Sequence, residues 1–378
     1  MASEVVGKDT PKSELGDEER YYMASQWQLM WRKFKRHKLA LIGGSVLLLL
    51  YLAAFFCGFI APYDIYRRNS DYLFCPPQPI RFIDESGGFH IRPFVYGYTR
   101  QRNPETLELE FTVDKSQQFP IRLFGHGDAY KFWGLFEADR HLFGVEEPGY
   151  FFLMGTDKLG RDIFSRILYG GRVSLTIGLV GVALSFTLGC LFGGLSGYYG
   201  GIMDTIIQRV IEYLISIPTI PLWMALAVAV PRDWPPLRVY FAIVVILSLI
   251  GWCGLARVVR GKIISLREED YVLAAVIAGE KDMRIITGHL LPAFMSYLIV
   301  NLTLAIPGMI LGETALSFLG LGIRAPAVSW GVLLNEAQHV QVVVLYPWLL
   351  FPGLFVLIVV LAFNFLGDGL RDAADPYR

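Results

Sequence analysis

The chain has 378 residues, of which 54% are hydrophobic and 18% are charged, and its mean hydropathy is +0.44. Basic and acidic residues both number 34, so the sequence lacks the basic excess that favours nucleic-acid binding. Soluble proteins of this length carry about 25% charged residues. The composition therefore predicts a membrane protein whose partners do not include nucleic acid.

Residues 1–38 form a polar N-terminal segment, and its last seven residues, Arg32–Lys38, include five Lys or Arg. By the positive-inside rule, such a cluster beside the first span places the N-terminus in the cytoplasm. Two interpretations of Trp27–Lys38 remain open, an amphipathic helix on the inner membrane surface and a plain basic anchor.

Six segments have no charged residue and are long enough to cross a bilayer core of about 30 Å, which takes about 20 helical residues. An ionised side chain at the centre of a span costs about 2.5–3.5 kcal/mol, so uncharged runs of this length favour spans over loops. The first run is too long and begins too late for a cleavable signal peptide. Six spans return the C-terminus to the cytoplasm. The predicted spans are residues 39–60, 173–198, 213–231, 239–256, 290–312 and 340–367.

Residues 61–172 separate the first two spans and, by this topology, lie outside the cytoplasm. The strict alternation of apolar and polar residues in Leu107–Asp114 predicts a half-buried strand. Ser86–Gly88, between Ile80–Ile83 and Phe89–Tyr98, predicts a hairpin turn. We therefore expect a β-containing insertion, followed by a core of five further spans in residues 173–378. The aromatic residues of the insertion are open to two interpretations, its own core and a docking surface: Phe119, Phe124, Tyr130, Phe132, Trp133 and Phe136.

The second span carries small residues at every fourth position, which places them on one face of a helix. Such a face lets two helix backbones approach closely within a membrane. The stretch Gly197–Gly201 also predicts a turn at the end of this span. The series consists of Gly181, Ser185, Gly189, Gly193, Gly197 and Gly201.

Prolines interrupt three of the later spans and predict kinks there, because proline removes a backbone donor from the helix. They are Pro218 and Pro221 in the third span, Pro307 in the fifth, and Pro347 and Pro352 in the sixth. Such kinks occur both in transporters and in static bundles.

The sequence contains no common catalytic motif. It has no G-x-x-x-x-G-K-[ST] phosphate loop, no H-E-x-x-H, no G-x-S-x-G and no Cys/His cluster with metal spacing. The spans also lack the ionisable chains of proton-coupled pumps, and we expect Glu212, Glu313 and Asp368 at span ends, in contact with water. We therefore expect no metal, no cofactor and no catalytic residue in this chain, and an energy source on another polypeptide.

Residues 257–289 connect the fourth and fifth spans and are expected in the cytoplasm. Apolar residues at helical spacing predict a short helix from Asp270, and Gly279 suits the left-handed conformation that ends a helix. A second helix should follow, with Pro292 in the first turn of the fifth span. Such short helices are marginal alone, so this elbow must pack on a partner or on its own bundle. Its apolar side is expected to contain Val272, Leu273, Val276 and Ile277, then Met283, Ile286 and Leu290.

This segment resembles the signature of ABC-importer permeases, which reads Glu-Ala-Ala, three residues, Gly, nine residues, Ile-x-Leu-Pro. The chain has Leu273-Ala274-Ala275, three residues, Gly279, nine residues, and His289-Leu290-Leu291-Pro292, so Leu273 replaces the glutamate and His289 the isoleucine. In that family the elbow is the coupling helix, which seats in a cleft of a cytoplasmic ATPase. The resemblance implies ATPase-coupling roles for Asp270, Tyr271, Ala274, Ala275, Gly279, Glu280, Arg284, His289 and Pro292.

Four further blocks are similar to the C-type subunit of the dipeptide/oligopeptide/nickel permeases. They are Gly155–Leu175, Glu313–Gly322, Trp330–Gly331 and Gly367–Pro376. The resemblance covers residues 34–60 and 150–378. The outer segment of roughly 65–150 is longer than in typical members and is similar to the enlarged loop of some peptide-type permeases.

The resemblance implies an all-α membrane protein, with six transmembrane helices of the type I ABC importer permease fold and a β-containing insertion between the first two. It implies one permease subunit of a bacterial inner-membrane importer for peptides. The partners would be a homologous B-type permease, two ATPases that bind ATP and Mg²⁺, and an extracytoplasmic binding protein. The translocation path would lie between the two permeases, with Pro218, Pro221 and Asn301 as candidate lining residues.

Several alternatives remain open. Oligosaccharides or nickel are alternative substrates on the same scaffold. A secondary transporter would need inverted repeats or intramembrane charges, which the sequence does not reveal. A membrane-bound enzyme would use the outer segment, with Asp157 and Asp162 as paired carboxylates. The competing interpretation of these two residues is an ordering salt bridge with Arg161.

Overall fold

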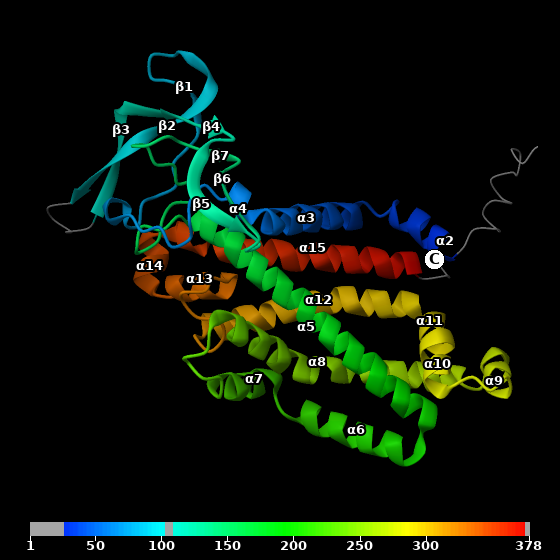
Figure 1. Cartoon of the computed structure of the whole chain (residues 1–378). Helices are drawn as coiled ribbons and strands as arrows, with labels where there is room; N and C mark the ends of the chain where they lie inside the picture. The colour runs from blue at the N-terminus through cyan, green and yellow to red at the C-terminus, as the bar shows by residue number, and fades with distance from the viewer. Residues whose placement is uncertain (1–25, 103–108, 375–378) are drawn as a thin grey trace, which may run out of the picture.

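The computed structural model of the protein describes residues 26–102 and 109–374. Parts of three sequence predictions lie outside these residues: most of the N-terminal tail, the start of the strand predicted from Leu107, and the last residues of the block Gly367–Pro376. Within the described part, five elements are long and apolar enough to cross a membrane (Figure 1). They are α3 (Lys38–Phe55), α5 (Ile163–Tyr199), α8 (Pro236–Leu266), α12 (Met295–Phe318) and the stretch Pro347–Ala374, which combines η3 (Pro347–Leu350) with α15 (Phe351–Ala374).

The third predicted span, residues 213–231, is wrong as a continuous helix. The chain instead forms α6 (Gly201–Ser216) and α7 (Thr219–Val228), which meet at an angle of 87°. Ile217 between them has an extended backbone. A residue before proline is disfavoured in the helical region, and Pro218 lacks the donor that would continue α6. The predicted kink is therefore a full break, and the pair forms a sixth span only if both helices are counted together.

The fifth span is displaced from its predicted bounds of 290–312, because Phe294 has a non-helical backbone and α12 begins at Met295. Since α12 runs to Phe318, it includes Glu313, which is fully buried. The Glu313 carboxylate accepts hydrogen bonds from Ser174 Oγ at 2.9 Å and Ser317 Oγ at 2.7 Å. The expectation that Glu313 lies in water at a span end is therefore wrong: serine hydroxyls replace the water.

The sixth predicted span, residues 340–367, also begins too early. Residues Val340–Leu345 form a separate short helix, α14. Tyr346 then leaves the helical region, as a residue before proline tends to do, and the span starts at Pro347. It continues beyond residue 367, to Ala374.

The series of small residues packs α5 against α8, as predicted. A Cβ placed on Gly193 would lie 2.5 Å from the carbonyl oxygen of Ala256, and one on Gly197 would lie 2.8 Å from that of Arg260. Only glycine permits backbones this close. The predicted turn is confirmed by positive φ angles at Gly200 and Gly201, so Gly201 begins α6 rather than extending the series.

In the described residues, the outer segment forms four β-ladders in three small sheets. Asp84 Oδ1 accepts the Gly88 amide at 2.8 Å in the first turn, which confirms the predicted hairpin. The buried core of this segment centres on Val95, Ile121 and Phe151. The sheets are the antiparallel sheet β1–β2–β3 (Arg81–Ile83, Phe89–Arg102, Leu109–Pro120), the pair β4–β7 (Arg122–Leu123, Phe143–Gly144) and the pair β5–β6 (His126–Phe132, Phe136–Arg140).

The aromatic residues of the insertion do not all belong to its core. Phe119 packs against the core cluster. Phe124, Trp133 and Phe136 are 60%, 40% and 58% exposed, so the core interpretation is wrong for these three. They lie on hairpin edges or turns, where a strand has a solvent-facing side.

Asp157 and Asp162 have separate structural roles. The Asp157 carboxylate accepts from Arg161 Nε at 2.6 Å and from Arg166, and Glu336 on α13 (Trp330–Ala337) contacts the same two arginines. The predicted salt bridge with Arg161 is therefore confirmed. Asp162 instead caps the N-terminus of α5, where Oδ2 accepts the Ser165 amide at 2.7 Å. The two carboxylates are thus used for different contacts rather than as a catalytic pair.

The two ends of the helical bundle differ. The strands, together with α4 (Cys57–Ile60) and α13, gather at one end (Figure 1). The amphipathic segment predicted near the basic cluster appears as α2 (Gln26–Phe34) at the other end, beside the end of α15. The segment between α8 and α12 also lies at that end (Figure 1).

Candidate functional site: the elbow between α8 and α12

The elbow consists of α9 (Asp270–Ile277), α10 (Asp282–Ile285), the π-helical turn η2 (Ile286–Leu290) and α11 (Leu291–Ala293). It follows α8, which continues ten residues beyond the predicted end of the fourth span at Ala256. Pro292 lies in the first turn of α11, where its missing donor needs no partner, and Phe294 separates α11 from α12. The predicted helix–glycine–helix arrangement is present, with an extra turn before the span.

Gly279 ends α9 in the left-handed conformation, with φ of +77°. Its amide donates to the Val276 carbonyl at 3.0 Å, and the Glu280 amide donates to the Ala275 carbonyl at 3.1 Å. These two bonds form a Schellman motif, which satisfies the last carbonyls of the helix. A Cβ on Gly279 would meet no heavy atom of the described residues within 4 Å, so the constraint is conformational and not one of space.

Glu280, Arg284 and His289 meet across the elbow. His289 Nε2 lies 3.0 Å from Glu280 Oε2, and Arg284 Nε lies 3.7 Å from the same oxygen. Glu280 and His289 are respectively 28% and 36% exposed. Exposed ion pairs contribute little free energy, so this contact orients the second arm more than it stabilises it.

One side of the elbow packs on its own bundle. Val272 and Ala275 of α9 are buried, as are Ile285, Ile286 and Leu290. These residues form one apolar cluster with Val259 and Ile263 of α8. The elbow is therefore seated on the extension of α8, and movement of α9 is coupled to that helix.

The other side of α9 is apolar as well, although one apolar side was predicted. Leu273, Val276 and Ile277 are 47%, 49% and 87% exposed, and Met283 on α10 is 46% exposed. Tyr271 is 44% exposed, and Ala274 is also exposed. The single apolar face predicted for these residues is therefore wrong: α9 has an inner apolar face on α8 and an outer one that faces away from the bundle. We call Tyr271, Leu273, Val276, Ile277 and Met283 the outer elbow face.

Two side chains missed by the sequence analysis tie the elbow to α5. Tyr199 Oη donates to Asp282 Oδ2 at 2.8 Å, and Tyr198 Oη donates to Asp282 Oδ1 at 3.2 Å. The signal available in the sequence was the Tyr-Tyr-Gly-Gly stretch at the end of the second span, but its partner is 83 residues away.

The candidate path residues lie on separate helices. Pro218 is the N-terminal cap of α7, and Pro221 lies in its first turn; both are exposed. Asn301 is half-buried on α12, where Nδ2 donates to the Tyr297 carbonyl at 3.2 Å. Their role in lining a path stays a prediction.

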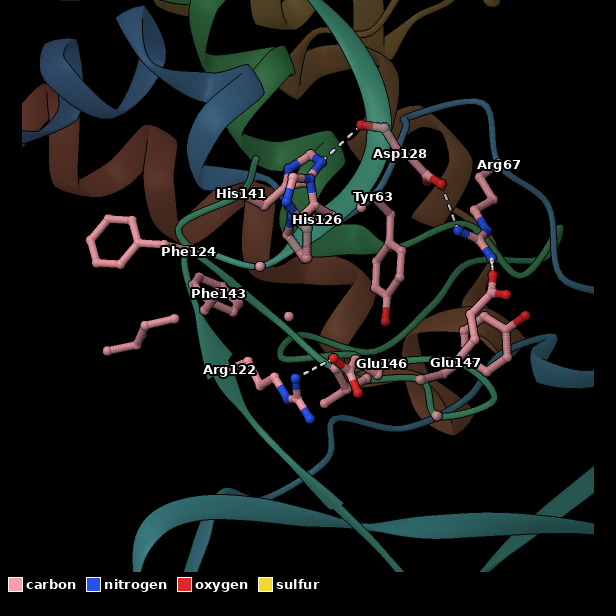
Figure 2. A pocket seen from close by; sticks show the side chains of 18 residues that line it. Tyr63, Arg67, Arg122, Phe124, His126, Asp128, His141, Phe143, Glu146 and Glu147 are labelled. Carbon is pink, nitrogen blue, oxygen red and sulfur yellow. Dashed lines mark hydrogen bonds and ion pairs between the residues drawn. The ribbon is translucent and has the colours of Figure 1, made fainter. Parts of the chain in front are cut away.

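The outer domain contains a separate cavity of about 600 Å³, between the β4–β7 pair and the chain that leaves α4 (Figure 2). The Arg67 guanidinium lies 5.6 Å from the rings of both Tyr63 and Tyr150 and donates to Asp128 Oδ1 at 2.6 Å. Burial raises the pKa of the Tyr63 phenol, although its oxygen accepts the Phe151 amide. Because Arg67 contacts all three side chains, we infer that it stabilises the wall of the cavity.

Metal-binding geometry is absent from the described ranges, 26–102 and 109–374: no three His, Cys, Asp or Glu side chains come together there in a way that would hold an ion.

The chain is similar in sequence to known protein families and to individual relatives. Residues 187–377 match the family model of the binding-protein-dependent transport system inner membrane component, and residues 25–77 match the N-terminal TM domain of oligopeptide transport permease C. The dipeptide transport system permease protein DppC of Bacillus subtilis (strain 168) is 34% identical over 93% of this chain and 86% of its own length. The oligopeptide transport system permease protein OppC of Haemophilus influenzae is 41% identical over 60% of this chain and 71% of its own.

Among solved structures, the inward-facing MetNI methionine ABC transporter is 18% identical, with a TM-score of 0.44, over 56% of this chain and 97% of that chain. The first family match spans just over half of this chain and includes the whole elbow. The DppC relative extends the similarity over most of the remainder. The chain therefore belongs to the binding-protein-dependent transport system inner membrane components, the multi-pass permease subunits of ABC importers, and it has their type I fold.

Proposed function

We propose that this chain is one of two permease subunits of a bacterial peptide importer, and that the elbow passes the closure of partner ATPases to the spans. The observation that carries this proposal is the outer elbow face. It exposes Leu273, Val276 and Ile277 at the end of the bundle opposite the strands, while the inner face of α9 is fixed to α8. An apolar surface on a short helix with one side already packed is suited to a groove in a second protein.

The assembly that we propose contains a homologous B-type permease, two ATPases and an extracytoplasmic binding protein. ATP and Mg²⁺ are bound by the ATPases, so this chain needs no cofactor and catalyses no reaction itself. The basic residues near α2 and the elbow lie at the same end of the bundle, and the positive-inside rule favours the cytoplasm for that end and for both termini.

The proposed cargo is a short peptide, and the translocation path lies between the two permeases. The names of the DppC and OppC relatives support peptides over oligosaccharides and nickel. In this proposal the break at Pro218 and the region of Pro221 and Asn301 border the path.

The test is ATP-dependent uptake by the complete importer in proteoliposomes, with peptide, oligosaccharide or nickel supplied through the cognate binding protein. Peptide uptake supports the assignment, and uptake of nickel or oligosaccharide instead of peptide refutes the substrate.

The coupling role is tested separately with Ile277→Asp, on the residue of α9 that is 87% exposed. A charge in an interfacial anchor position costs about 2 kcal/mol or more, so ATPase binding to the permease pair should weaken about tenfold or more. The matched control is Ile91→Asp, since Ile91 is 89% exposed but lies on β2. Equal ATPase binding by both variants would contradict the coupling role.

A further inference from the structure

The turn between β5 and β6 has an unusual conformation and composition. It joins Phe132 to Phe136 through Trp133, Gly134 and Leu135, and the Leu135 amide donates to the Phe132 carbonyl at 2.9 Å. Trp133 and Gly134 have φ of +50° and +75°. A bulky residue with positive φ is strained, and such strain persists only where surrounding contacts fix it. We call residues Phe132–Phe136 the hairpin tip.

Contacts with two transmembrane helices fix Trp133. Its Nε1 donates to the Phe55 carbonyl at 3.2 Å, and its ring lies 5.4 Å from that of Phe55. Phe55 is the last residue of α3, where carbonyl groups lack intrahelical donors. On the other side, the Arg172 guanidinium of α5 lies 3.7 Å from the indole centroid. The hairpin tip is therefore attached to the last residue of α3 and to Arg172 of α5, nine residues after that helix begins.

The remaining side chains of the tip are apolar and uncovered. Leu135 is 81% exposed and Phe136 is 58% exposed. Phe132 is the partly covered member of the tip, since its ring packs between that of Phe55, at 5.7 Å, and that of Phe136, at 5.2 Å. The tip thus continues the exposed apolar surface of α3, which includes Leu48, Leu49, Leu52, Phe55 and Phe56.

Charged residues begin one position further from the turn on each strand. Lys131 and Glu137 form an ion pair at 3.3 Å, and both side chains are largely exposed. Beyond them, His126 pairs with Asp139 at 2.8 Å. The hairpin is therefore divided along its length into an apolar tip at the level where α3 ends and a charged base beyond it.

We propose that the hairpin tip inserts into the outer interface of the lipid bilayer beside α3, so that the outer domain has a membrane contact of its own. Tryptophan and arginine are typical of the level at which spans leave the hydrocarbon core, and exposed Leu and Phe side chains gain by burial among acyl chains. Of the five single candidate spans, α3 is the least buried within the chain, which leaves lipid as the neighbour of this surface. The occupant is therefore a lipid surface and not a peptide or a nucleotide.

The experiment measures the depth of a nitroxide label in the complete importer, in nanodiscs of phosphatidylethanolamine and phosphatidylglycerol. The label is attached to Leu135→Cys. The four native cysteines are buried, which limits background labelling. The matched control is Ile91→Cys, because Ile91 is an apolar residue of similar exposure on β2, two residues after that strand begins at Phe89.

At Leu135→Cys, collision with oxygen relative to collision with a water-soluble nickel chelate should be several-fold higher than at Ile91→Cys. Equal ratios at the two positions would place the tip in water and overturn the proposal. A label at Leu135→Cys shielded from both reagents would mean that a protein subunit covers the tip, which overturns it as well. Neither result depends on which substrate the importer carries.

Discussion

The elbow and the outer domain both lie outside the candidate spans, and they are held to the spans by different forces. The elbow rests on apolar side chains that pack on α8, and Tyr198 and Tyr199 of α5 donate to Asp282 of the elbow. The outer domain joins the bundle through buried charges, and the Arg161–Glu336 contact joins residues 175 positions apart. Apolar packing is non-directional, whereas the buried ionic attachment requires one arrangement of its charged groups.

The largest expected effect is on the ionic attachment. Arg166 is 1% exposed and contacts both Asp157 and Glu336. Arg166→Ala leaves the buried Asp157 and the partly buried Glu336 with Arg161 as their remaining arginine partner, and removing one partner of a buried ion pair typically costs about 3–5 kcal/mol. We expect a large fall in the thermal unfolding midpoint of the purified subunit. Arg209→Ala is the control, since Arg209 is 79% exposed in its ion pair and its loss should cost under about 1 kcal/mol. An equal fall in the unfolding midpoint for both variants would show that the buried ionic attachment contributes no more than an exposed ion pair.

The second prediction concerns pH at the same end of the bundle. Burial raises the pKa of the Asp162 carboxyl to about 6 from a model-peptide value of 3.8, and Oδ1 has no hydrogen-bond partner among the described residues. The folded state thus binds a proton more readily than the unfolded state, so this stabilising contribution is complete below pH of about 4 and is lost as pH rises through about 6.

Asp162→Asn tests this prediction, because the amide oxygen can still accept the Ser165 amide without titrating. The stability of the natural protein relative to Asp162→Asn should fall by about 2 kcal/mol between pH 4.5 and pH 7.5. The measurement is the unfolding midpoint of both proteins over this range. A pH-independent difference would show that Asp162 does not titrate in this window.

The third prediction sharpens the comparison at the elbow. Gly279→Val places a β-branched residue at φ of +77°, which costs about 1–3 kcal/mol. The variant should insert and bind ATPases but lose most ATP-dependent uptake. Gly279→Asn is the control, since Asn tolerates this conformation better and the site has room for a side chain. Normal uptake by Gly279→Val would mean that the angle of the elbow is unimportant.

The smallest effect is expected for Glu280→Gln, which removes the charge facing His289 and Arg284. Because all three side chains are partly exposed, stability should change by about 0.2–1 kcal/mol, within a degree or two of the unfolding midpoint. A larger loss would show that the elbow, too, is held by charge.

Features that depend on neighbouring residues in the sequence could be predicted, whereas features that depend on distant parts of the chain could not. The turn at Gly279 and the helix from Asp270 depend on neighbours in the sequence, and both are confirmed. Pro292, predicted in the first turn of the fifth span, lies instead in α11, before that span begins at Met295. The outward turn of Leu273 and Ile277 could not be read from spacing alone, since it depends on which side of α9 meets α8.

Span bounds were predicted less well, because the absence of charge does not define a helix. Glu313 can be buried within α12 because the hydroxyl of Ser174, from a distant part of the chain, donates a hydrogen bond to its carboxylate. In the outer domain, the Ser86–Gly88 hairpin was local and predictable. The contacts of Trp133 with Phe55 and Arg172 were not, since they depend on how strands and spans meet in space.

The length of α5 has a consequence for how the two faces of the membrane communicate. Its 37 residues form an uninterrupted rod of about 55 Å, with no proline. Near its outer end, Arg166 forms an ion pair with Asp157. At its inner end, Tyr199 donates a hydrogen bond to Asp282 of the elbow. Because α5 is unbroken between these two points, we expect a tilt of its inner end to move its outer end as well.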